Sequence, residues 1–576
     1  MHRSSRTEPA RSPDLAPPTA AGLVPPAARG TPRHRLRRVL TALLIVTAGL
    51  TACSSVAEPP PSPPPPDQVP LPPDQTGVID IAFDLEPQAG LVHRPFLEWE
   101  VRTGDYGGDP FDIRAYARFT HTQGDSYRVP LYYAGDDTWR FRFTAPRAGT
   151  YLVETESVHE PFDALTTRAT FAANPDPEAR GFLVAEDGAF GVLVGDGTRS
   201  RPILYNVYQR HNSKRDPAGV ETPAHYSADP AVRGPHIEAL LDETQAHGMN
   251  ATFLLVGSNW LQHGNEYNEW STNEHPDEVT FEIIEDVLER AHARGMFLHI
   301  WMWADEENGN ASPLLRGGTN GPIDERLQYY IMGRLGSIPN WMVSLGYDLE
   351  EWVTPSEARR WRETMVGFND LPRLFMARET QDGSSGSSRF SLGSDKLDVY
   401  SVDQRPSADF FADARTMIER ADGRPVLYER RFLHTRDGVW DMDTTRRALW
   451  QFTLAGGAGG VWGVLWGDGA PYPSPESLRT LETFWHERIA VDYEPAVALG
   501  RRSFARHARD GATSVYYAES TRDVPLGTEG DGVVRAVAVD TRRPYEEIEI
   551  ELGSGDTLWR APRRSDWAIA VVRDDR

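Results

Sequence analysis

The feature that most constrains the fold is a long region in which short apolar strands alternate with amphipathic helices. Helical periodicity is clear in His236–Leu241, Phe281–Leu288 and Ala414–Ile418, each between two predicted strands. Eight strands, each followed by a helix over residues 176–488, match the count and length of a (β/α)8 barrel. A doubly wound open sheet is the rival, but no glycine-rich phosphate loop follows the first strand. The predicted strands are Pro202–Tyr208, Ala251–Val256, Phe297–Trp303, Trp341–Tyr347, Leu374–Arg378, Leu397–Val402, Pro425–Glu429 and Gly460–Trp466.

Period-two alternation flanks this region on both sides. Residues 77–175 contain runs such as Phe96–Val101 and Ile113–Phe119 at roughly ten-residue spacing, which predicts a β-sandwich. A predicted hairpin over residues 181–194 leads into the barrel, and alternation returns over residues 489–576, which predicts a second, smaller sandwich. We therefore expect a multidomain chain, with a TIM barrel between an N-terminal and a C-terminal β-sandwich.

The first 76 residues have the composition of an export signal and a tether. Arginines precede the apolar run Val39–Leu50, which is too short to cross a bilayer core of ~30 Å as a permanent helix. The sequence Leu50-Thr51-Ala52-Cys53 is similar to the lipobox of bacterial lipoproteins, so residues 1–53 are interpreted as a lipoprotein signal peptide with lipidation at Cys53. The alternative is an uncleaved anchor with an inert cysteine, but Cys53 is the only cysteine and has no disulfide partner.

Residues 54–76 are rich in proline and favour an extended linker that cannot pack into a core. Together, signal, lipid and linker predict an extracytoplasmic protein that is lipid-anchored to the cell membrane. The net charge of −24 argues against a nucleic-acid partner, whose phosphates require basic patches. We predict no protein partner.

Carboxylate side chains follow two strands of the predicted barrel. Glu350 and Glu351 follow the fourth strand, and Glu429 ends the seventh. The active site of such a barrel lies at the carboxyl ends of its strands, and hydrolysis of a glycoside with retention needs two carboxyl groups ~5 to 5.5 Å apart. Glu350 or Glu351 could instead interact with the dipole of the following helix. Glu429 precedes two arginines, Arg430 and Arg431, which could keep it ionised.

Aromatic and polar side chains gather at the other strand ends, where sugar rings could stack or form hydrogen bonds. Taken singly, such an aromatic residue is more often part of the core, so the cluster is stronger evidence than any member. The acidic loop at Asp305 could bind calcium or a sugar hydroxyl, but such loops are usually only solvated. No zinc spacing is present, and we expect neither a metal nor a cofactor. The predicted substrate-binding residues are Tyr205, Trp260, His299, Trp301, Trp303, Asp348, Arg378, Trp462 and Trp466.

The order of the regions, together with several motifs, resembles the apiosidase-like, clan A-type glycoside hydrolases. The run Trp139–Phe143, followed by Pro146 and Gly149–Tyr151, is similar to the N-terminal sandwich that precedes many such barrels. Val515–Tyr517 and Ser565–Ile569 resemble the small C-terminal sandwich that is sometimes labelled collagen-binding, a label from which we infer no collagen.

This resemblance implies a retaining glycosidase in which the glutamate after the fourth strand is the acid/base and Glu429 is the nucleophile. The family usually has Asn-Glu after the fourth strand, whereas this chain has Asp348-Leu349-Glu350-Glu351. We favour Glu351 as the acid/base, with Glu350 and Asp348 as alternatives. The predicted function is cleavage of O-glycosidic bonds in poly- or oligosaccharides by double displacement. The alternatives are a catalytically inactive carbohydrate-binding lipoprotein and, third, an adhesin.

Overall fold

The computed structural model describes most of the chain beyond residue 82. The described residues are 83–93, 96–104, 106–210, 221–265, 271–303, 317–346, 349, 353–377, 397–402, 409–429, 442–463, 475–489, 493–494, 496–527, 533–553 and 555–573.

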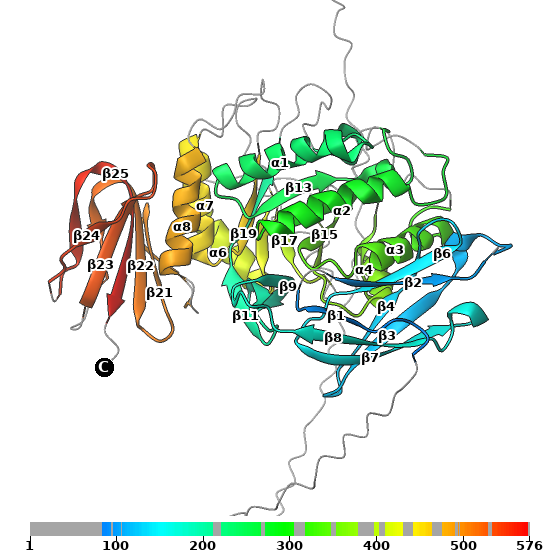
Figure 1. Cartoon of the computed structure of the whole chain (residues 1–576). Coiled ribbons are helices and arrows are strands. Elements are labelled where there is room, and N and C mark those ends of the chain that lie inside the picture. The colour runs from blue at the N-terminus through cyan, green and yellow to red at the C-terminus, as the bar shows by residue number, and fades with distance from the viewer. Residues whose placement is uncertain are drawn as a thin grey trace, which may run out of the picture. The chain divides into compact units, whose positions relative to one another are not determined.

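The central element is a parallel sheet of eight strands, ordered β16-β15-β14-β13-β12-β19-β18-β17 (Figure 1). Asp398 and Val399, directly before the outer strand β17, donate backbone hydrogen bonds to the carbonyl of Phe375 in the other outer strand, β16. The sheet is therefore a nearly closed barrel, and the predicted TIM barrel is confirmed. Its strands are β12 (Tyr205–Gln209), β13 (Ala251–Leu255), β14 (Phe297–Trp303), β15 (Trp341–Gly346), β16 (Phe375–Met376), β17 (Tyr400–Val402), β18 (Val426–Tyr428) and β19 (Gly459–Gly463).

Helices alternate with these strands along the chain, as the sequence periodicity predicts. Their starts carry local signals: Asp229, Asp277 and Thr354 each accept a hydrogen bond from a backbone N–H in the first turn. Apolar faces of several helices pack on the outer side of the strands in one large core cluster, which includes Phe281 and Trp361. The described helices of the barrel are α1 (Pro230–Ala246), α2 (Glu278–Ala293), α3 (Pro322–Arg334), α4 (Pro355–Phe368), α6 (Phe410–Arg420), α7 (Met442–Ala455) and α8 (Pro475–Arg488), with short 3-10 turns η3 (Pro223–His225) and η4 (Gly257–Trp260).

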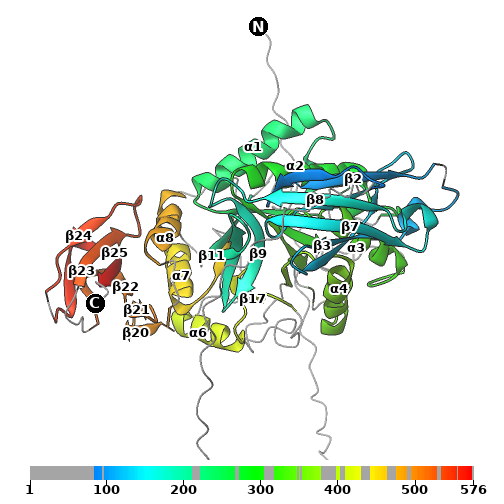
Figure 2. The same cartoon turned by 60° about the horizontal axis from the view of Figure 1, so that its bottom comes forward.

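A small antiparallel sheet closes the amino end of the barrel. It consists of β9 (Arg180–Glu186), β10 (Ala189–Val194) and β11 (Arg199–Ile203), which leads directly into β12, so the predicted hairpin is present (Figure 2). Its apolar side chains share a core cluster with the inward-facing side chains of the barrel, and the ring of Phe190 lies 5.1 Å from that of Tyr205. Side chains of this small sheet thus fill the barrel interior at the amino ends of the strands.

The residues before this hairpin form two sheets that pack face to face, as a β-sandwich does. One sheet has the order β1-β8-β7-β3-β4 and the other β2-β6-β5. Between them lies an aromatic core in which Trp99 stacks on Phe141 and Phe119 stacks on Phe143. The strands are β1 (Gln88–Leu91), β2 (Leu97–Arg102), β3 (Ala115–His121), β4 (Ser126–Pro130), β5 (Tyr132–Tyr133), β6 (Thr138–Phe143), β7 (Gly149–Ser157) and β8 (Thr166–Ala172), with 3-10 turns η1 (Pro110–Asp112) and η2 (Glu160–Phe162).

The last region is a six-stranded sheet with antiparallel pairing throughout, ordered β20-β21-β22-β25-β23-β24. One face packs on α6 and α7, where Phe411 stacks on Phe504 and Trp450 stacks on Tyr517. The other face has its own core cluster, which includes Trp567. The strands are β20 (Val497–Gly500), β21 (Ser503–His507), β22 (Thr513–Pro525), β23 (Val533–Asp540), β24 (Ile548–Ile550) and β25 (Leu558–Arg573).

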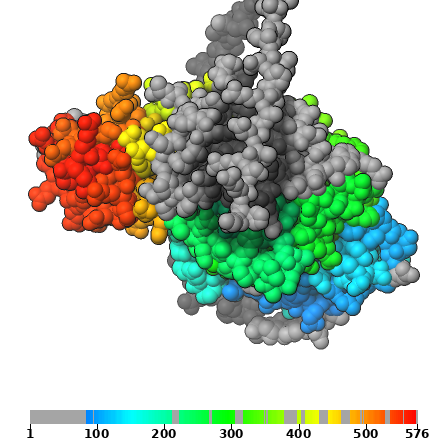
Figure 3. All heavy atoms as spheres, turned by 90° about the horizontal axis from the view of Figure 1, so that it is seen from above, coloured from blue at the N-terminus to red at the C-terminus, as the bar shows by residue number. Residues whose placement is uncertain are grey.

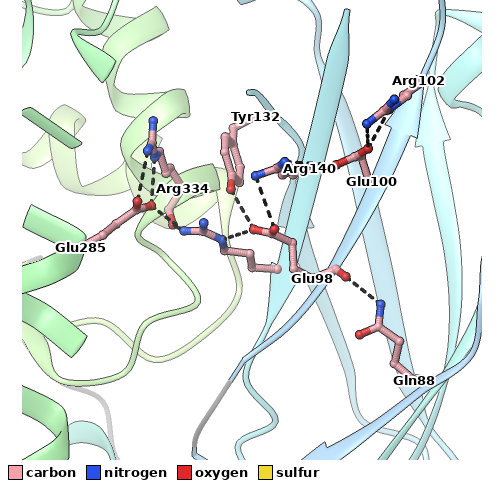
Figure 4. A network of polar contacts seen from close by, with 9 residues as sticks. Gln88, Glu98, Glu100, Arg102, Tyr132, Arg140, Glu285 and Arg334 are labelled. Atoms are coloured by element: carbon pink, nitrogen blue, oxygen red, sulfur yellow. Dashed lines mark hydrogen bonds and ion pairs between the residues drawn. The ribbon is translucent and has the colours of Figure 1, made fainter. Parts of the chain in front are cut away.

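A buried ion network joins the N-terminal sandwich to the barrel helices (Figure 4). Arg334 of α3 donates two hydrogen bonds to Glu285 of α2, and Arg142 of β6 binds the same carboxylate from the sandwich. Arg142 also donates to Glu98, which accepts a hydrogen bond from the hydroxyl of Tyr132. Burial opposes ionisation, but the two arginines outweigh it and lower the pKa of Glu285. In Figure 3 the sandwich, in blue, adjoins the green surface of the helical layer.

Within the described residues, no helix is long and apolar enough to cross a membrane.

Candidate active site

Glu429 lies at the carboxyl end of strand β18 and points into the barrel. Leu427, two residues earlier, belongs to the interior cluster, whereas Tyr428 packs in a cluster on the helical side. Successive side chains of a strand alternate between its faces, so Glu429 shares the inward face of Leu427. Its side chain is fully buried. The structure thus places this carboxylate where barrel enzymes carry their catalytic groups.

Three side chains from two other strands hold the Glu429 carboxylate. The Oγ of Ser401 on β17 donates to Oε2 at 2.8 Å. On β14, the Nε2 of His299 lies 3.0 Å from Oε1 and the Nε1 of Trp301 donates to the same oxygen at 3.2 Å. Three donors around one carboxyl group fit the ionised form, which only accepts hydrogen bonds. Its described partners are thus polar side chains of the barrel wall, while Arg430 and Arg431 lie outside the described residues.

Two contacts meet at the Nε2 of His299, which lies 3.0 Å from the Oε1 of Glu429 and 3.1 Å from the Nε1 of Trp301. If Nε2 carries the proton, it donates to Glu429; if Nδ1 carries the proton, Nε2 accepts from the indole N–H of Trp301 instead. In both tautomers the other ring nitrogen, Nδ1, is buried without a hydrogen-bond partner. His299 therefore offers one unpaired polar atom inside the barrel.

Further polar atoms of the inward face also lack partners. Both amide atoms of Gln209, the Oγ of Ser344 and the Oη of Tyr205 are buried with none. Ser344 is the strand neighbour of Trp301, so it lies beside the ring that binds Glu429. Each buried polar group without a partner costs about 1–3 kcal/mol, so such a group calls for an explanation such as a ligand or a bound water.

Tyr205, the first residue of β12, lies at the amino end of this interior. Its ring packs 5.1 Å from Phe190 of the hairpin and 6.0 Å from His299. Burial, and then the nearby charge of Glu429, raise the pKa of the Tyr205 hydroxyl far above its ordinary value. Tyr205, His299 and Trp301, all predicted to bind substrate, are therefore brought together around Glu429.

Trp260 and Trp303 occupy a different environment. Both are fully buried in the core cluster that joins the strands to the helices. The indole N–H of Trp260 donates to the carbonyl of Met302, and its ring lies 5.2 Å from that of Phe281 on α2. These contacts make Trp260 a packing residue of the helical layer, while the proposed sugar contact of either tryptophan stays a prediction.

The remaining predicted residues cannot be placed within the site. Trp462 lies in β19, but its side chain is outside the described part of the chain. The other residues that fall outside it are Asp348, Glu350, Glu351, Arg378, Trp466 and Cys53. The acidic loop at Asp305 is also outside it. The described residues contain no group of three or more histidine, cysteine, aspartate or glutamate side chains arranged to hold a metal ion.

Gln209, Ser344 and Ser401 are polar residues of the barrel interior that the sequence pattern did not indicate. Each is a polar residue on a barrel strand, and Ser344 and Ser401 stand between apolar or aromatic neighbours, which was the available signal. Such residues are also common as satisfied members of a core, so this signal alone does not separate them from structural ones. The contact of Ser401 with Glu429, and the unpaired atoms of Gln209 and Ser344, distinguish these three residues from ordinary core residues.

Comparison with known proteins agrees with this fold. The profile of a domain of unknown function (DUF5060) matches residues 95–158, within the N-terminal sandwich. A protein of Bacteroides vulgatus, provisionally described as a glycoside hydrolase, has 15% sequence identity and a TM-score of 0.63; the alignment covers 84% of this chain and all of that one (100%). None of the curated proteins compared with the chain matches it.

Two other solved structures are more distant. A family 5 glycoside hydrolase from Bacteroides vulgatus has 14% identity and a TM-score of 0.49, with 68% of this chain and 94% of that chain covered. A family 39 glycoside hydrolase from Bacteroides cellulosilyticus has 10% identity and a TM-score of 0.41, with coverage of 85% and 100%. At these identities a likeness concerns the fold alone, and only the first of the three is similar enough to support a shared fold.

Proposed function

We propose that this chain is a retaining glycoside hydrolase in which Glu429 is the nucleophile. The observation that carries the proposal is the setting of Glu429: a buried carboxylate at the carboxyl end of a barrel strand, held by three side chains, with unpaired polar atoms on the same inward face of the barrel. A hydroxyl-rich ligand would supply the missing hydrogen-bond partners. The glycoside hydrolase described for the similar fold supports the same class.

The chemistry requires a second carboxyl group that protonates the leaving oxygen and later activates water. We assign this role to Glu351, with Glu350 and Asp348 as alternatives, because they follow β15 at the same end of the barrel. Glu429 would attack the anomeric carbon, displace the leaving group and form a glycosyl-enzyme that water then hydrolyses with net retention. The substrates would be poly- or oligosaccharides.

Replacement of Glu429 tests the nucleophile. With a panel of aryl glycosides and polysaccharides, Glu429→Gln should lose at least about a thousandfold in kcat. Glu519→Gln is the matched control, because Glu519 is a buried glutamate on β22 outside the barrel and its replacement should leave kcat unchanged. Full activity of Glu429→Gln refutes the assignment. Sugar binding without hydrolysis by the wild type favours the inactive carbohydrate-binding protein instead.

Leaving-group dependence separates the acid/base candidates. A 2,4-dinitrophenyl leaving group departs without protonation, whereas a sugar leaving group needs a general acid. The glutamine variant of the true acid/base, at Glu350 or Glu351, should therefore still form the glycosyl-enzyme from dinitrophenyl glycosides but fail on natural linkages. The configuration of the first-formed product, observed by NMR, tests retention.

We also propose that Cys53 carries the lipid that anchors the enzyme outside the cytoplasm. The support is the lipobox-like sequence and the proline-rich linker that follows it. The expected result of Cys53→Ser is loss of the protein from the membrane fraction. Membrane association unchanged by this substitution contradicts the anchor.

A further inference from the structure

Gln209 is the last residue of β12, and it faces the inside of the barrel. Val207 belongs to the interior cluster, while the hydroxyl of Tyr208 reaches outward to Glu243 of α1. Alternation puts Gln209 on the inward face, one step beyond Val207 toward the carboxyl ends. Its strand neighbour is Gly463 of β19.

The amide of Gln209 is buried but unsatisfied. The residue is 2% exposed, and neither its Oε1 nor its Nε2 has a hydrogen-bond partner. Asn250, at the other end of the same strand pair, is a useful contrast. Its Nδ2 donates to the carbonyl of Leu204 and its Oδ1 accepts from the N–H of Asn206, so it fastens the backbone of β12. Both amide atoms of Asn250 thus have backbone partners, whereas neither amide atom of Gln209 has one.

The chemistry of a carboxamide limits what Gln209 can bind. It presents one acceptor oxygen and one donor NH2 group side by side and carries no charge. Two neighbouring hydroxyl groups on a sugar ring match that pair, because each hydroxyl both donates and accepts. The unpaired Nδ1 of His299 and Oγ of Ser344 face the same interior and add one ring nitrogen and one hydroxyl to this set.

We infer that Gln209 is a specificity-determining residue that binds two adjacent hydroxyl groups of the sugar at the reaction centre. This inference rests on the proposed glycosidase function and adds the substrate class to it: glycosides whose reacting ring keeps two neighbouring hydroxyls free. Gln209 takes no part in bond making or breaking. Its role is to select and orient the ring that Glu429 attacks.

The test pairs a protein substitution with a substrate change. Full-length wild type and Gln209→Leu are assayed with 2,4-dinitrophenyl glycosides of pentoses and hexoses, and then with monodeoxy derivatives of the best substrate. Gln209→Leu should lose about 10- to 100-fold in kcat/KM on the parent glycoside. Removing the recognised hydroxyl should cost the wild type a similar factor and cost the variant almost nothing, because the interaction is already lost.

Thr252→Val is the matched control. Its hydroxyl is also buried and unpaired on a barrel strand, but Thr252 alternates with the inward-facing Ala251 and Phe253 and thus faces outward. This variant should keep wild-type kinetics on every substrate. Circular dichroism and thermal unfolding establish that both variants are folded.

Binding of free monosaccharides, measured by calorimetry, separates the two levels of the proposal. If the wild type hydrolyses glycosides and Gln209→Leu matches it on all of them, the inference about Gln209 fails while the glycosidase stands. Suppose instead that the wild type hydrolyses no glycoside but binds sugars, and that Gln209→Leu does not bind them. The inference about sugar recognition then holds, and the proposed glycosidase function fails. If the wild type neither hydrolyses nor binds any of these probes, both the inference and the proposed function are overturned.

Discussion

Glu285 and Glu429 are two largely buried glutamates of the barrel domain with opposite surroundings. Glu285 lies outside the strands and is shared by Arg142 and Arg334, which saturate its oxygens. Glu429 lies inside the strands, its described partners are His299, Trp301 and Ser401, and neighbouring polar atoms have no partner at all. A saturated carboxylate stabilises the structure, whereas a carboxylate among unsatisfied groups is available for a ligand. Burial alone does not distinguish the two.

A second cluster of one carboxylate and two arginines joins the C-terminal sheet to the barrel. There the carboxylate, Asp566, belongs to the sheet, and both arginines, Arg446 and Arg447, come from helix α7 of the barrel. Burial again opposes ionisation, and the arginines together with the N–H of Ser520 lower the pKa of Asp566. One carboxylate between two arginines thus lies at the contact of each flanking region with the barrel. Saturated ion clusters therefore stabilise both contacts between the flanking regions and the barrel.

Glu285→Gln should produce the largest change in stability. It leaves two buried guanidinium groups without their shared counter-charge, which costs about 3–5 kcal/mol of unfolding free energy. Glu429→Gln keeps an acceptor for neutral donors and should cost less than about 1 kcal/mol. Urea unfolding at pH 7 measures both. Equal losses would remove the distinction between the two glutamates.

The pH dependence sharpens this prediction. Because the folded state lowers the pKa of Glu285, its stabilisation is present above the ordinary glutamate pKa and is lost as the pH falls through the lowered value. The gap in stability between the wild type and Glu285→Gln should therefore shrink below about pH 4. A gap that stays constant down to pH 3 would contradict an ionic origin.

Ser401→Ala tests the other side of the comparison, with an intermediate effect on activity. A hydrogen bond to a charged group is worth about 1.5–3 kcal/mol, so loss of the 2.8 Å bond to Glu429 should lower kcat on an accepted glycoside about 10- to 100-fold. Ser337→Ala is the control, because Ser337 is an equally buried serine whose hydroxyl donates to the carbonyl of Arg142 at the sandwich contact. It should lower stability and leave kcat intact. If Ser401→Ala lowers stability but leaves kcat unchanged, Ser401 has only a structural role.

Glu519→Gln should have the smallest effect. Burial raises the pKa of Glu519 more than the hydrogen bond from Gln451 and the charge of Arg447 lower it. The folded state therefore favours the protonated acid, and stability is lost as the pH rises through the raised pKa. The neutral glutamine avoids this loss, so the variant should be more stable than wild type at pH 8, by at most about 1 kcal/mol, and equal to it at pH 4. A variant that is less stable at pH 8 would contradict the direction of the shift.

The sequence by itself determined the eight barrel strands, the helices between them, the hairpin and the flanking antiparallel sheets. These follow from periodicity, and periodicity is local: it records which face of a segment is buried. It also indicated Glu429, because a charged residue that ends an apolar strand stands out among its neighbours.

Only the tertiary structure decided which polar groups meet. Gln209, His299, Ser344, Ser401 and Glu429 come from different strands, and no local pattern links Ser401 to a carboxylate or shows that Gln209 lacks a partner. In the same way, Trp301 and Trp260 look alike in the sequence, yet one binds Glu429 and the other packs on α2. The reason is physical: hydrogen bonding depends on the register and closure of the barrel, which bring residues far apart in the chain within about 3 Å of each other.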